Sequence, residues 1–332
     1  MRVLVTGAAG FIGSHYVRTL LDGGYPGTEH ARVTALDLLT YAGNRDNLPA
    51  SHPRLEFVHG DVCDQPLLRE LLLGHDAVVH FAAESHVDRS LRSGADFVRT
   101  NVTGVLSLME ACRSTGVPRV VHVSTDEVYG SITHGSWTEE SRLDPRSPYS
   151  SSKAAGDLVA LSYWHSHKVE VSVTRGVNTY GPHQHPEKLI PRFVTNLMDG
   201  TPLPLYGDGR NIREWMHVAD HCAAVHRVLS DGRPGEIYNI AEGTSLTNLA
   251  LTERLLALCG ADASMIRRVP DRKGHDLRYA LDSTKLRAEL GHGPRVPFDR
   301  GLADTVDWYR DNPDWWKRTK QEYDDGEGGY GT

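Results

Sequence analysis

The feature that most constrains the fold is a glycine motif that directly follows a short apolar run, Arg2–Thr6. Gly7, Gly10 and Gly13 have GxxGxxG spacing. Glycines are needed where the backbone turns tightly with phosphate packed against it, because a Cβ would leave no room. The free N–H groups at the start of the following helix then bind a pyrophosphate. The motif therefore predicts a Rossmann-type fold that binds a dinucleotide.

An acidic residue at the end of the second apolar run indicates which dinucleotide. Asp37 lies 24 positions after Gly13. Such a carboxylate accepts hydrogen bonds from the ribose hydroxyls of adenosine and repels a 2′-phosphate, which predicts NAD rather than NADP. Asp61 and Val62 follow the third apolar run, where an adenine ring would lie. An ordinary surface loop explains these last two residues nearly as well.

The pattern beyond the glycine motif predicts a parallel sheet with helices on both faces. Short runs rich in β-branched residues alternate with helical stretches through the first half of the chain. Continuous apolar runs are typical of strands that are buried on both faces. The strands we expect are Arg2–Thr6, Arg32–Asp37, Leu55–Gly60, Ala77–Ala82, Val120–Ser124 and Val169–Thr174. The predicted fold class is α/β, with a Rossmann-type doubly wound parallel sheet.

The length of 332 residues predicts one large domain and a smaller one. We expect an NAD-binding Rossmann domain over residues 1–180. A helix over Asp220–Leu229 and a strand over Glu236–Ile240 indicate that residues 214–242 return to it. A smaller, interleaved C-terminal α/β substrate domain is expected over 181–213 and 243–320. The acidic, glycine-rich residues 321–332 are expected to form a disordered tail.

Composition argues against several classes of function. The net charge of −7 does not suit nucleic-acid binding, which needs a basic surface. No apolar run is long enough to span a membrane, and a strand begins at once, so we expect neither a membrane span nor a signal peptide. The four cysteines lack CxxC spacing, and His183 and His185 lack a third ligand. We therefore expect a cytoplasmic protein without a metal.

A second motif carries the chemistry. Tyr149 and Lys153 follow Pro148, a residue that suits the first turn of a helix. Residues i and i+4 lie on one helix face, so the ammonium would lie beside the phenol and favour its ionised form. A phenolate can take a proton from a substrate hydroxyl while hydride leaves the same carbon. YxxxK occurs by chance, but after the glycine motif it predicts a dehydrogenase site.

These motifs stand in segments that resemble the extended short-chain dehydrogenase/reductase family and, within it, the dTDP-glucose 4,6-dehydratases. The resemblance covers nearly the full length. Besides Gly7–Gly13, the matching segments are Leu39–Asn44, Ala82–Asp88, Ser124–Gly130, Tyr149–Lys153, Pro186–Pro191, Pro204–Gly207 and Lys273–Asp276. The most specific is Thr125-Asp126-Glu127, because related 4-epimerases share the glycine loop and YxxxK but lack the adjacent Asp and Glu.

The resemblance implies dehydration of dTDP-glucose to dTDP-4-keto-6-deoxyglucose with tightly bound NAD. The sugar is oxidised at C4, water leaves across C5 and C6, and hydride returns to C6. The elimination needs a base for the C5 proton and an acid for the C6 hydroxyl. The resemblance assigns Glu127 as the base and Asp126 as the acid, beside Thr125, Tyr149 and Lys153. Asp126 can donate a proton at neutral pH only if burial or a nearby carboxylate raises its pKa.

The resemblance also implies which residues contact each ligand. The cofactor residues are Gly7, Gly10, Phe11, Ile12, Gly13, Asp37, Leu38, Thr40, Asp61, Val62, Phe81, Ala82, Ala83, Ser85, Thr100, Ser124, Tyr149, Lys153 and Thr179. The substrate residues are Ser85, Thr125, Asn178, Glu187, Lys188, Leu189, Pro204, Tyr206, Arg213, Asn248, Asp271, Arg272, His275 and Tyr279. Arg and Lys suit a diphosphate, and aromatic or apolar groups suit thymine.

One segment departs from the family pattern Arg-Cys-Ser-Asn-Asn-Tyr-Gly-Pro. This chain has Gly176, Val177 and Thr179 at the second, third and fifth positions. Because the catalytic residues are untouched, we keep the assignment and expect an effect on cofactor retention or nicotinamide orientation. The alternatives are a nucleotide-sugar 4-epimerase, a GDP- or UDP-sugar 4,6-dehydratase, and a catalytically silent protein that senses NAD.

The resemblance further implies a homodimer. Its contact would use the helices over Phe97–Cys112 and Tyr149–Trp164, which have apolar residues on more than one face. Such a pair would form a four-helix bundle about a two-fold axis.

Overall fold

A seven-stranded parallel sheet lies at the centre of the protein, whose computed structural model describes residues 1–271 and 274–327. The strands are β1 (Arg2–Thr6), β2 (Arg32–Asp37), β3 (Leu55–His59), β4 (Ala77–His80), β5 (Val120–Thr125), β6 (Val171–Gly176) and β10 (Ile237–Ile240). Their order across the sheet is β10-β6-β5-β4-β1-β2-β3. The order switches direction between β1 and β4, and a ligand crevice forms at the carboxyl edge of such a switch point.

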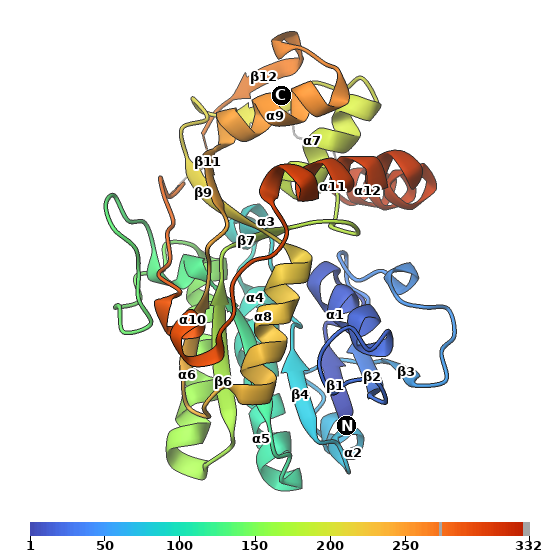
Figure 1. Ribbon diagram of the computed structural model, residues 1–332, viewed down its shortest axis with the longest axis vertical. Coiled ribbons are helices and arrows are strands. Elements are labelled where there is room, and N and C mark those ends of the chain that lie inside the picture. The colour runs from blue at the N-terminus through green and yellow to red at the C-terminus, as the bar shows by residue number, and fades with distance from the viewer. Residues whose placement is uncertain (272–273, 328–332) are drawn as a thin grey trace.

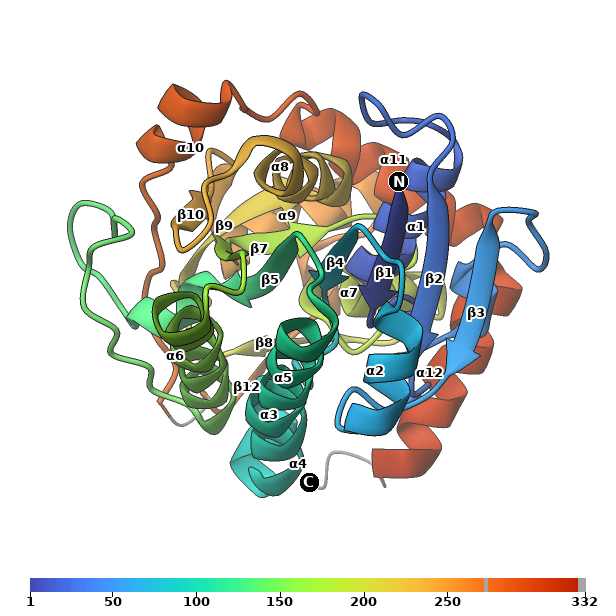
Figure 2. The ribbon, with the colours of Figure 1, turned by 90° about the horizontal axis from the view of Figure 1, so that it is seen from below.

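Helices cover both faces of this sheet, as Figure 2 shows. Helices α1 (Phe11–Leu21) and α8 (Val218–Asp231) lie on one face. Helices α2 (Gln65–Leu72), α5 (Val105–Thr115) and α6 (Pro148–His167) lie on the other. The sheet therefore has no face open to solvent over its central strands, which explains the continuous apolar runs in the sequence.

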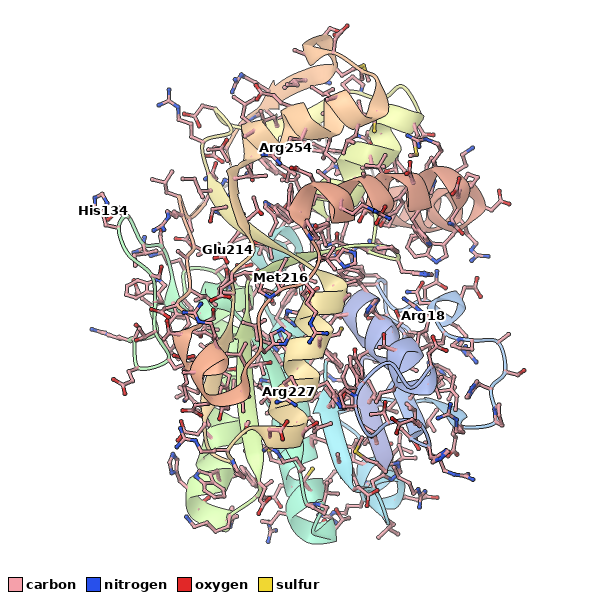
Figure 3. All side chains as sticks on the ribbon, viewed as in Figure 1. Arg18, His134, Glu214, Met216, Arg227 and Arg254 are labelled. Atoms are coloured by element: carbon pink, nitrogen blue, oxygen red, sulfur yellow. The ribbon has the colours of Figure 1, made fainter. Side chains whose placement is uncertain are left out.

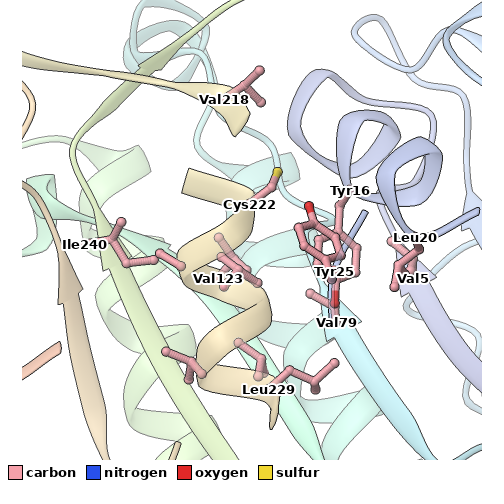
Figure 4. Packing of buried hydrophobic residues seen from close by; sticks show 14 of the residues in the cluster. Val5, Tyr16, Leu20, Tyr25, Val79, Val123, Val218, Cys222, Leu229 and Ile240 are labelled. Carbon is pink, nitrogen blue, oxygen red and sulfur yellow. The ribbon is translucent and has the colours of Figure 1, made fainter. Parts of the chain in front are cut away.

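Neighbouring residues of each central strand belong to opposite hydrophobic cores. Val5 and Val79 belong to the core on the α8 side of the sheet, which also contains Leu229 of α8 (Figure 4). Leu4 and Val78 point the other way, into the core beneath α2 and α5. Full burial of each such side chain stabilises the fold by about 1.5–3 kcal/mol. The double burial holds the strand ends, and with them the site, in fixed register.

A second, smaller group of elements covers the carboxyl edge of the sheet (Figure 1). Strands β7 (Asn178–Tyr180), β9 (Ile212–His217) and β11 (Thr244–Thr247) form one sheet, and β8 (Leu203–Tyr206) pairs with β12 (Ile266–Val269). Helices α7 (Leu189–Met198), α9 (Asn248–Cys259), α11 (Phe298–Asp311) and α12 (Pro313–Glu327) pack with them. Strand β9, which carries Glu214 and Met216 in Figure 3, joins the two parts: Met216 enters the main core and Trp215 the second one.

The remaining elements connect these parts. They are α3 (Val87–Arg92), α4 (Ala95–Val98), a π-helical segment η2 (Arg99–Gly104), α10 (Thr284–Leu290), and the short 3₁₀ turns η1 (Arg45–Asn47), η3 (Asp126–Tyr129) and η4 (Ala263–Met265). The single helix expected over Phe97–Cys112 is thus divided among α4, η2 and α5. No helix in the described ranges combines the length and apolar character that crossing a bilayer requires.

The predicted fold class is confirmed, and β1 and β2 have the predicted bounds. Strand β6 begins at Val171 rather than at residue 169. Strand β10 and helix α8, from residues 214–242, do belong to the central layer. Residues 321–327, which were expected to belong to a disordered tail, continue helix α12. Trp316 anchors that helix in the second core, a contact that composition did not reveal. Residues 328–332 lie outside the described part.

Candidate active site

The glycine loop between β1 and α1 leaves no space for side chains. Gly7 has a φ of +65°, and a Cβ there would lie 2.5 Å from the backbone nitrogen of Ala82. A Cβ on Gly13 would lie 2.2 Å from the carbonyl oxygen of Gly7. Both distances are too short for real contacts, so the loop presents bare backbone at the amino end of α1. This is the arrangement that binds a pyrophosphate.

Asp37 ends β2 beside this loop and is 8% exposed. Its two carboxylate oxygens accept hydrogen bonds from the N–H groups of Ala9 and Leu39, each at 2.8 Å. Burial raises the pKa of Asp37, although the backbone hydrogen bonds oppose this shift. The carboxylate therefore fastens the glycine loop to the strand end and also faces the adjoining cavity.

A cavity of about 310 Å³ extends along the carboxyl edge of the sheet. It is lined by every residue predicted to contact the cofactor: Gly7, Gly10, Phe11, Ile12, Gly13, Asp37, Leu38, Thr40, Asp61, Val62, Phe81, Ala82, Ala83, Ser85, Thr100, Ser124, Tyr149, Lys153 and Thr179. Sequence reasoning missed Gln184, His185 and His221, which line the same cavity. These three belong to no motif with its own spacing, and only packing brings them to the site.

The Asp61 carboxylate is already engaged within the protein. It accepts a hydrogen bond from the Cys63 N–H at 2.8 Å and pairs with Arg99 of the π-helical segment. Burial acts to raise the pKa of Asp61, but these two partners outweigh it and hold the pKa below its usual range. A Cβ on Gly104 would lie 2.8 Å from Val62, so the π-helical segment packs closely against this end of the cavity.

The end of β5 turns sharply and directs two carboxyl groups into the cavity. The Thr125 side chain caps the turn η3 by accepting a hydrogen bond from the Glu127 N–H, and its hydroxyl lies 3.2 Å from Asp126 Oδ1. Asp126 is 2% exposed, and its Oδ2 has no hydrogen-bond partner among the described residues. Burial, followed by the charge of Glu127, raises the pKa of Asp126 to about 8. A carboxyl in this state can donate a proton at neutral pH.

Helix α6 places Tyr149 and Lys153, the YxxxK pair, in the lining of the same cavity. Ser147 and Ser150 form a capping box at its start, which fixes the first turn. Burial, followed by the charge of Glu127, raises the pKa of Tyr149, and a hydrogen bond with Thr125 opposes the shift. Lys153 Nζ donates to the Val123 carbonyl oxygen at 2.8 Å.

The effect of Lys153 on the ionisation of Tyr149 stays a prediction. Burial lowers the pKa of Lys153 to about 8, while Asp157, four residues further along the same helix face, acts to raise it. Asp157 is itself buried and pairs with Arg175 at 2.9 Å. The charge of Glu127 adds to the effect of burial on the pKa of Tyr149, so an added positive charge would favour ionisation of the phenol.

A second cavity, of about 190 Å³, continues from the first. The two share Ser85, Glu127, Asn178, Thr179, Gln184, Glu187 and Lys188. Of the predicted substrate residues, Leu189, Pro204, Tyr206, Arg213, Asn248, His275 and Tyr279 also line the second cavity, whereas Thr125 lines only the first. Asp271 is outside both linings and binds His275 Nδ1 at 2.6 Å. Arg272 lies outside the described residues.

Charged side chains at the second cavity lie close to other side chains. Glu187 is 4% exposed and lies 3.7 Å from Arg89 and 3.8 Å from Lys188. The Arg213 guanidinium stacks 4.3 Å from the centre of the Tyr279 ring. Arg192, Trp215 and Asp276 line the cavity as well and were missed by the sequence analysis.

Two buried amide oxygens are left for a ligand. Asn178 Oδ1 and Asn248 Oδ1 have no hydrogen-bond partner among the described residues. Because an unpaired buried polar atom is costly, such groups at a cavity indicate a polar ligand. The joined cavities can thus hold a long ligand next to two carboxyls and a phenol.

The chain was compared with known proteins. A family model described as GDP-mannose 4,6 dehydratase matches residues 4–305. The dTDP-glucose 4,6-dehydratase of Streptomyces niveus is 56% identical over 322 residues, which cover 96% of each chain. The chain belongs to the dTDP-glucose 4,6-dehydratase family. The crystal structure of the dTDP-glucose 4,6-dehydratase of Streptomyces venezuelae with NAD bound has a TM-score of 0.95 at 59% identity, covering 96% of this chain and 100% of that one.

A UDP-glucose 4-epimerase of Thermotoga maritima, solved with UDP-glucose, is similar at lower identity. Its TM-score is 0.87 at 30% identity, and the match covers 94% of this chain and 100% of that one. The fold is therefore shared by dehydratases and epimerases, and the residues at the site must separate the two.

The departure of this dehydratase from the family pattern has a structural counterpart. A Cβ on Gly176 would lie 2.4 Å from Cε1 of His221, so the imidazole fills the space of the missing side chain. His221 is 2% exposed, and its Nδ1 lies 3.3 Å from Thr179 Oγ1. Burial lowers the pKa of His221 to about 4, so the ring is neutral. Val177 packs into the main core.

The His183 and His185 pair serves in packing contacts. His183 packs against Trp308 in a tilted arrangement with ring centres 4.4 Å apart, and His185 and Tyr41 pack edge-on at 5.7 Å. Within the described ranges, no group of three His, Cys, Asp or Glu side chains is placed to hold a metal ion.

Proposed function

We propose that this protein converts dTDP-glucose to dTDP-4-keto-6-deoxyglucose with NAD held in the larger cavity. The observation that carries the proposal is the buried Asp126 next to Glu127, because a dehydration needs both an acid and a base, beyond the groups that oxidise C4. Asp126 lines the larger cavity and Glu127 lines both. A 4-epimerase removes no water and has no use for this pair.

The larger cavity suits NAD. Gly7 and Gly13 offer bare backbone to a pyrophosphate, and Asp37 offers a carboxylate at the strand end for the adenosine ribose. Ser124 Oγ is buried without a hydrogen-bond partner among the described residues, so it is available to the cofactor. When bound, NAD would accept a hydride from C4 of the sugar and later return one to C6, while C5 regains a proton.

Tyr149 takes the proton of the C4 hydroxyl as the C4–H bond breaks. Its phenol is buried, and Thr125 interacts with its oxygen. The positive charge of the oxidised cofactor would oppose the effect of burial and of Glu127 on the pKa of Tyr149. The Lys153 ammonium donates a hydrogen bond to the Val123 carbonyl oxygen. Lys153 lies four residues after Tyr149 on helix α6. The tyrosine is thus a base only when cofactor is present.

Elimination then uses the two carboxyls. Glu127 takes the C5 proton, which the new C4 ketone has made acidic. Asp126 gives its proton to the C6 hydroxyl, which leaves as water. The high pKa of Asp126 keeps that proton on the acid until it is needed.

The second cavity would hold the nucleotide part of the substrate. Lys188 and Arg213 suit the two phosphates, and Tyr206 and Tyr279 offer aromatic surface to thymine. Asn178 and Asn248 offer buried amide oxygens as hydrogen-bond acceptors.

Incubation with dTDP-glucose tests the proposal. The product should absorb in alkali as a 4-keto-6-deoxy sugar does, and its NMR spectrum should show a methyl group at C5. UDP-glucose in a parallel incubation should give no 4-epimer. A product that keeps its C6 hydroxyl would refute the proposed reaction.

Tyr149→Phe should abolish every step, whereas Glu127→Gln should retain some oxidation at C4 while losing exchange of the C5 proton.

We also propose that the protein is a cytoplasmic homodimer. Leu91, Val98, Leu106 and Leu158 are 44%, 54%, 43% and 61% exposed, and they lie on α3, α4, α5 and α6, which pack next to one another. An apolar face of this kind supports a two-fold contact. The four cysteines are unpaired, in keeping with a reducing compartment.

The predicted domain division is kept as part of the proposal. Residues 1–180 with 214–242 supply the sheet and most of the cofactor cavity, and residues 181–213 with 243–320 supply most of the second cavity.

A further inference from the structure

The loop of residues 38–48 after β2, here called the strap, forms one wall of the cofactor cavity. Leu38, Thr40 and Gly43 line that cavity. Leu39 has a φ of +54°, a strained value for a leucine. On the outer side of the strap lies another cavity, of about 230 Å³, which is lined by residues 41–47 together with Trp315 and Arg318 of helix α12. With a cavity on each side, the strap depends on a few specific contacts for its position.

Several of those contacts meet at Asn47, which is 3% exposed. Its side-chain amide donates to the Ala9 carbonyl oxygen of the glycine loop at 2.9 Å. Its Oδ1 accepts from the Trp315 indole N–H at 3.0 Å and lies 3.3 Å from His183 Nδ1. Arg18 of α1, labelled in Figure 3, donates to the Asn47 carbonyl oxygen. One amide therefore joins the glycine loop to a helix near the other end of the chain.

We propose that Asn47 and Trp315 form a clasp by which helix α12 holds the strap closed over the cofactor and so sets the rate at which NAD leaves. The glycine loop forms the other end of this connection. Its Ala9 carbonyl oxygen accepts hydrogen bonds from the Asn47 amide and from the Asn44 N–H, the latter at 3.0 Å. A second link between α12 and the strap, Arg318 with Asp46, is exposed at both ends, and such pairs contribute little. The partly buried indole–amide hydrogen bond is therefore the main connection between α12 and the strap.

Clasp and substrate site are chemically separate. Neither Asn47 nor Trp315 lines the cofactor or substrate cavity, so neither is a catalytic residue. They act on NAD only through the position of the strap. The inference rests on the proposed binding of NAD, and it concerns retention of the cofactor rather than the reaction.

Trp315→Phe tests the clasp, because it keeps an aromatic ring and removes the N–H donor. Trp308→Phe is the control for ring packing: Trp308 lies against His183 at 4.4 Å and against Trp315 at 5.1 Å between ring centres, but its indole is not among the described partners of Asn47. Each protein is loaded with radiolabelled NAD, chased with unlabelled NAD, and sampled by filter binding. Trp315→Phe should exchange up to about tenfold faster than the parent, which corresponds to the loss of one hydrogen bond. Trp308→Phe should exchange at the parent rate.

Melting temperatures and a double variant separate a clasp from general loss of stability. Asn47→Ala should exchange faster than Trp315→Phe, and the double variant should exchange no faster than Asn47→Ala alone, since both act on one link. Exchange by Trp315→Phe at the parent rate, or equal acceleration by Trp308→Phe, would overturn the clasp. A parent that retains no labelled NAD would overturn the proposed function itself.

Discussion

Replacing Asp126 with Asn tests the acid that distinguishes this enzyme from an epimerase. The carboxyl is 2% exposed, and burial with the charge of Glu127 raises its pKa to about 8. At pH 7 the acid form therefore outnumbers the carboxylate by about ten to one. An amide has nearly the same shape but is a far poorer proton donor. Elimination in Asp126→Asn should therefore slow by about 10²–10⁴.

The same pKa predicts how activity and stability change with pH. The kcat of the parent should fall as the pH rises through about 8, because Asp126 then loses the proton that it donates. The folded pKa lies above the ordinary value of 3.8, so the native state keeps a proton that the unfolded chain releases. Asp126 therefore makes its full contribution to the free energy of unfolding below pH 3.8. That contribution decreases by about 1.4 kcal/mol per pH unit as the pH rises from 3.8 to about 8. Asn does not titrate, so the melting temperature of Asp126→Asn should rise relative to that of the parent as the pH increases across this range.

The assay mixes enzyme with dTDP-glucose rapidly and follows NADH absorbance, with solvent deuterium at C5 measured in parallel. Asp126→Asn should still oxidise C4 and exchange the C5 proton while the final product accumulates slowly. Glu127→Gln is the matched comparison, because it should oxidise C4 but suppress the exchange. Turnover of Asp126→Asn at the parent rate, or the parent's pH profile in the variant, would refute the assignment.

Three further variants test other parts of the molecule. Asp37→Ala should reduce the preference for NAD over NADP by about tenfold, measured by cofactor titration, and a parent that binds both equally would contradict the role of Asp37. Gly176→Ala should lower the free energy of unfolding by about 1–3 kcal/mol, because the new Cβ meets His221, and an unchanged melting curve would disprove this. Leu158→Asp should convert the dimer to a monomer in sedimentation, whereas Leu258→Asp on α9, 38% exposed, should not; a parent that sediments as a monomer removes the basis for the dimer.

The sequence by itself determined the features that depend on a few neighbouring residues. The glycine loop with Gly7 and Gly13 requires only a short spacing after a strand, and the structure bears out its steric reason. Tyr149 and Lys153 share a helix face because they are four positions apart. Asp126 and Glu127 are adjacent in the chain, so a turn at the end of β5 is enough to bring both to one cavity.

Only the tertiary structure decided what depends on burial and on contacts between distant segments. The sequence could require a high pKa for Asp126, but the enclosure that raises it is a property of the packed site. The charge of Glu127 raises the pKa of Tyr149, an effect that helical spacing did not indicate. Asn47 and Trp315 meet across 268 positions. A linear pattern records which groups are present within a turn or a strand, whereas desolvation and long-range hydrogen bonds arise only when the layers close around them.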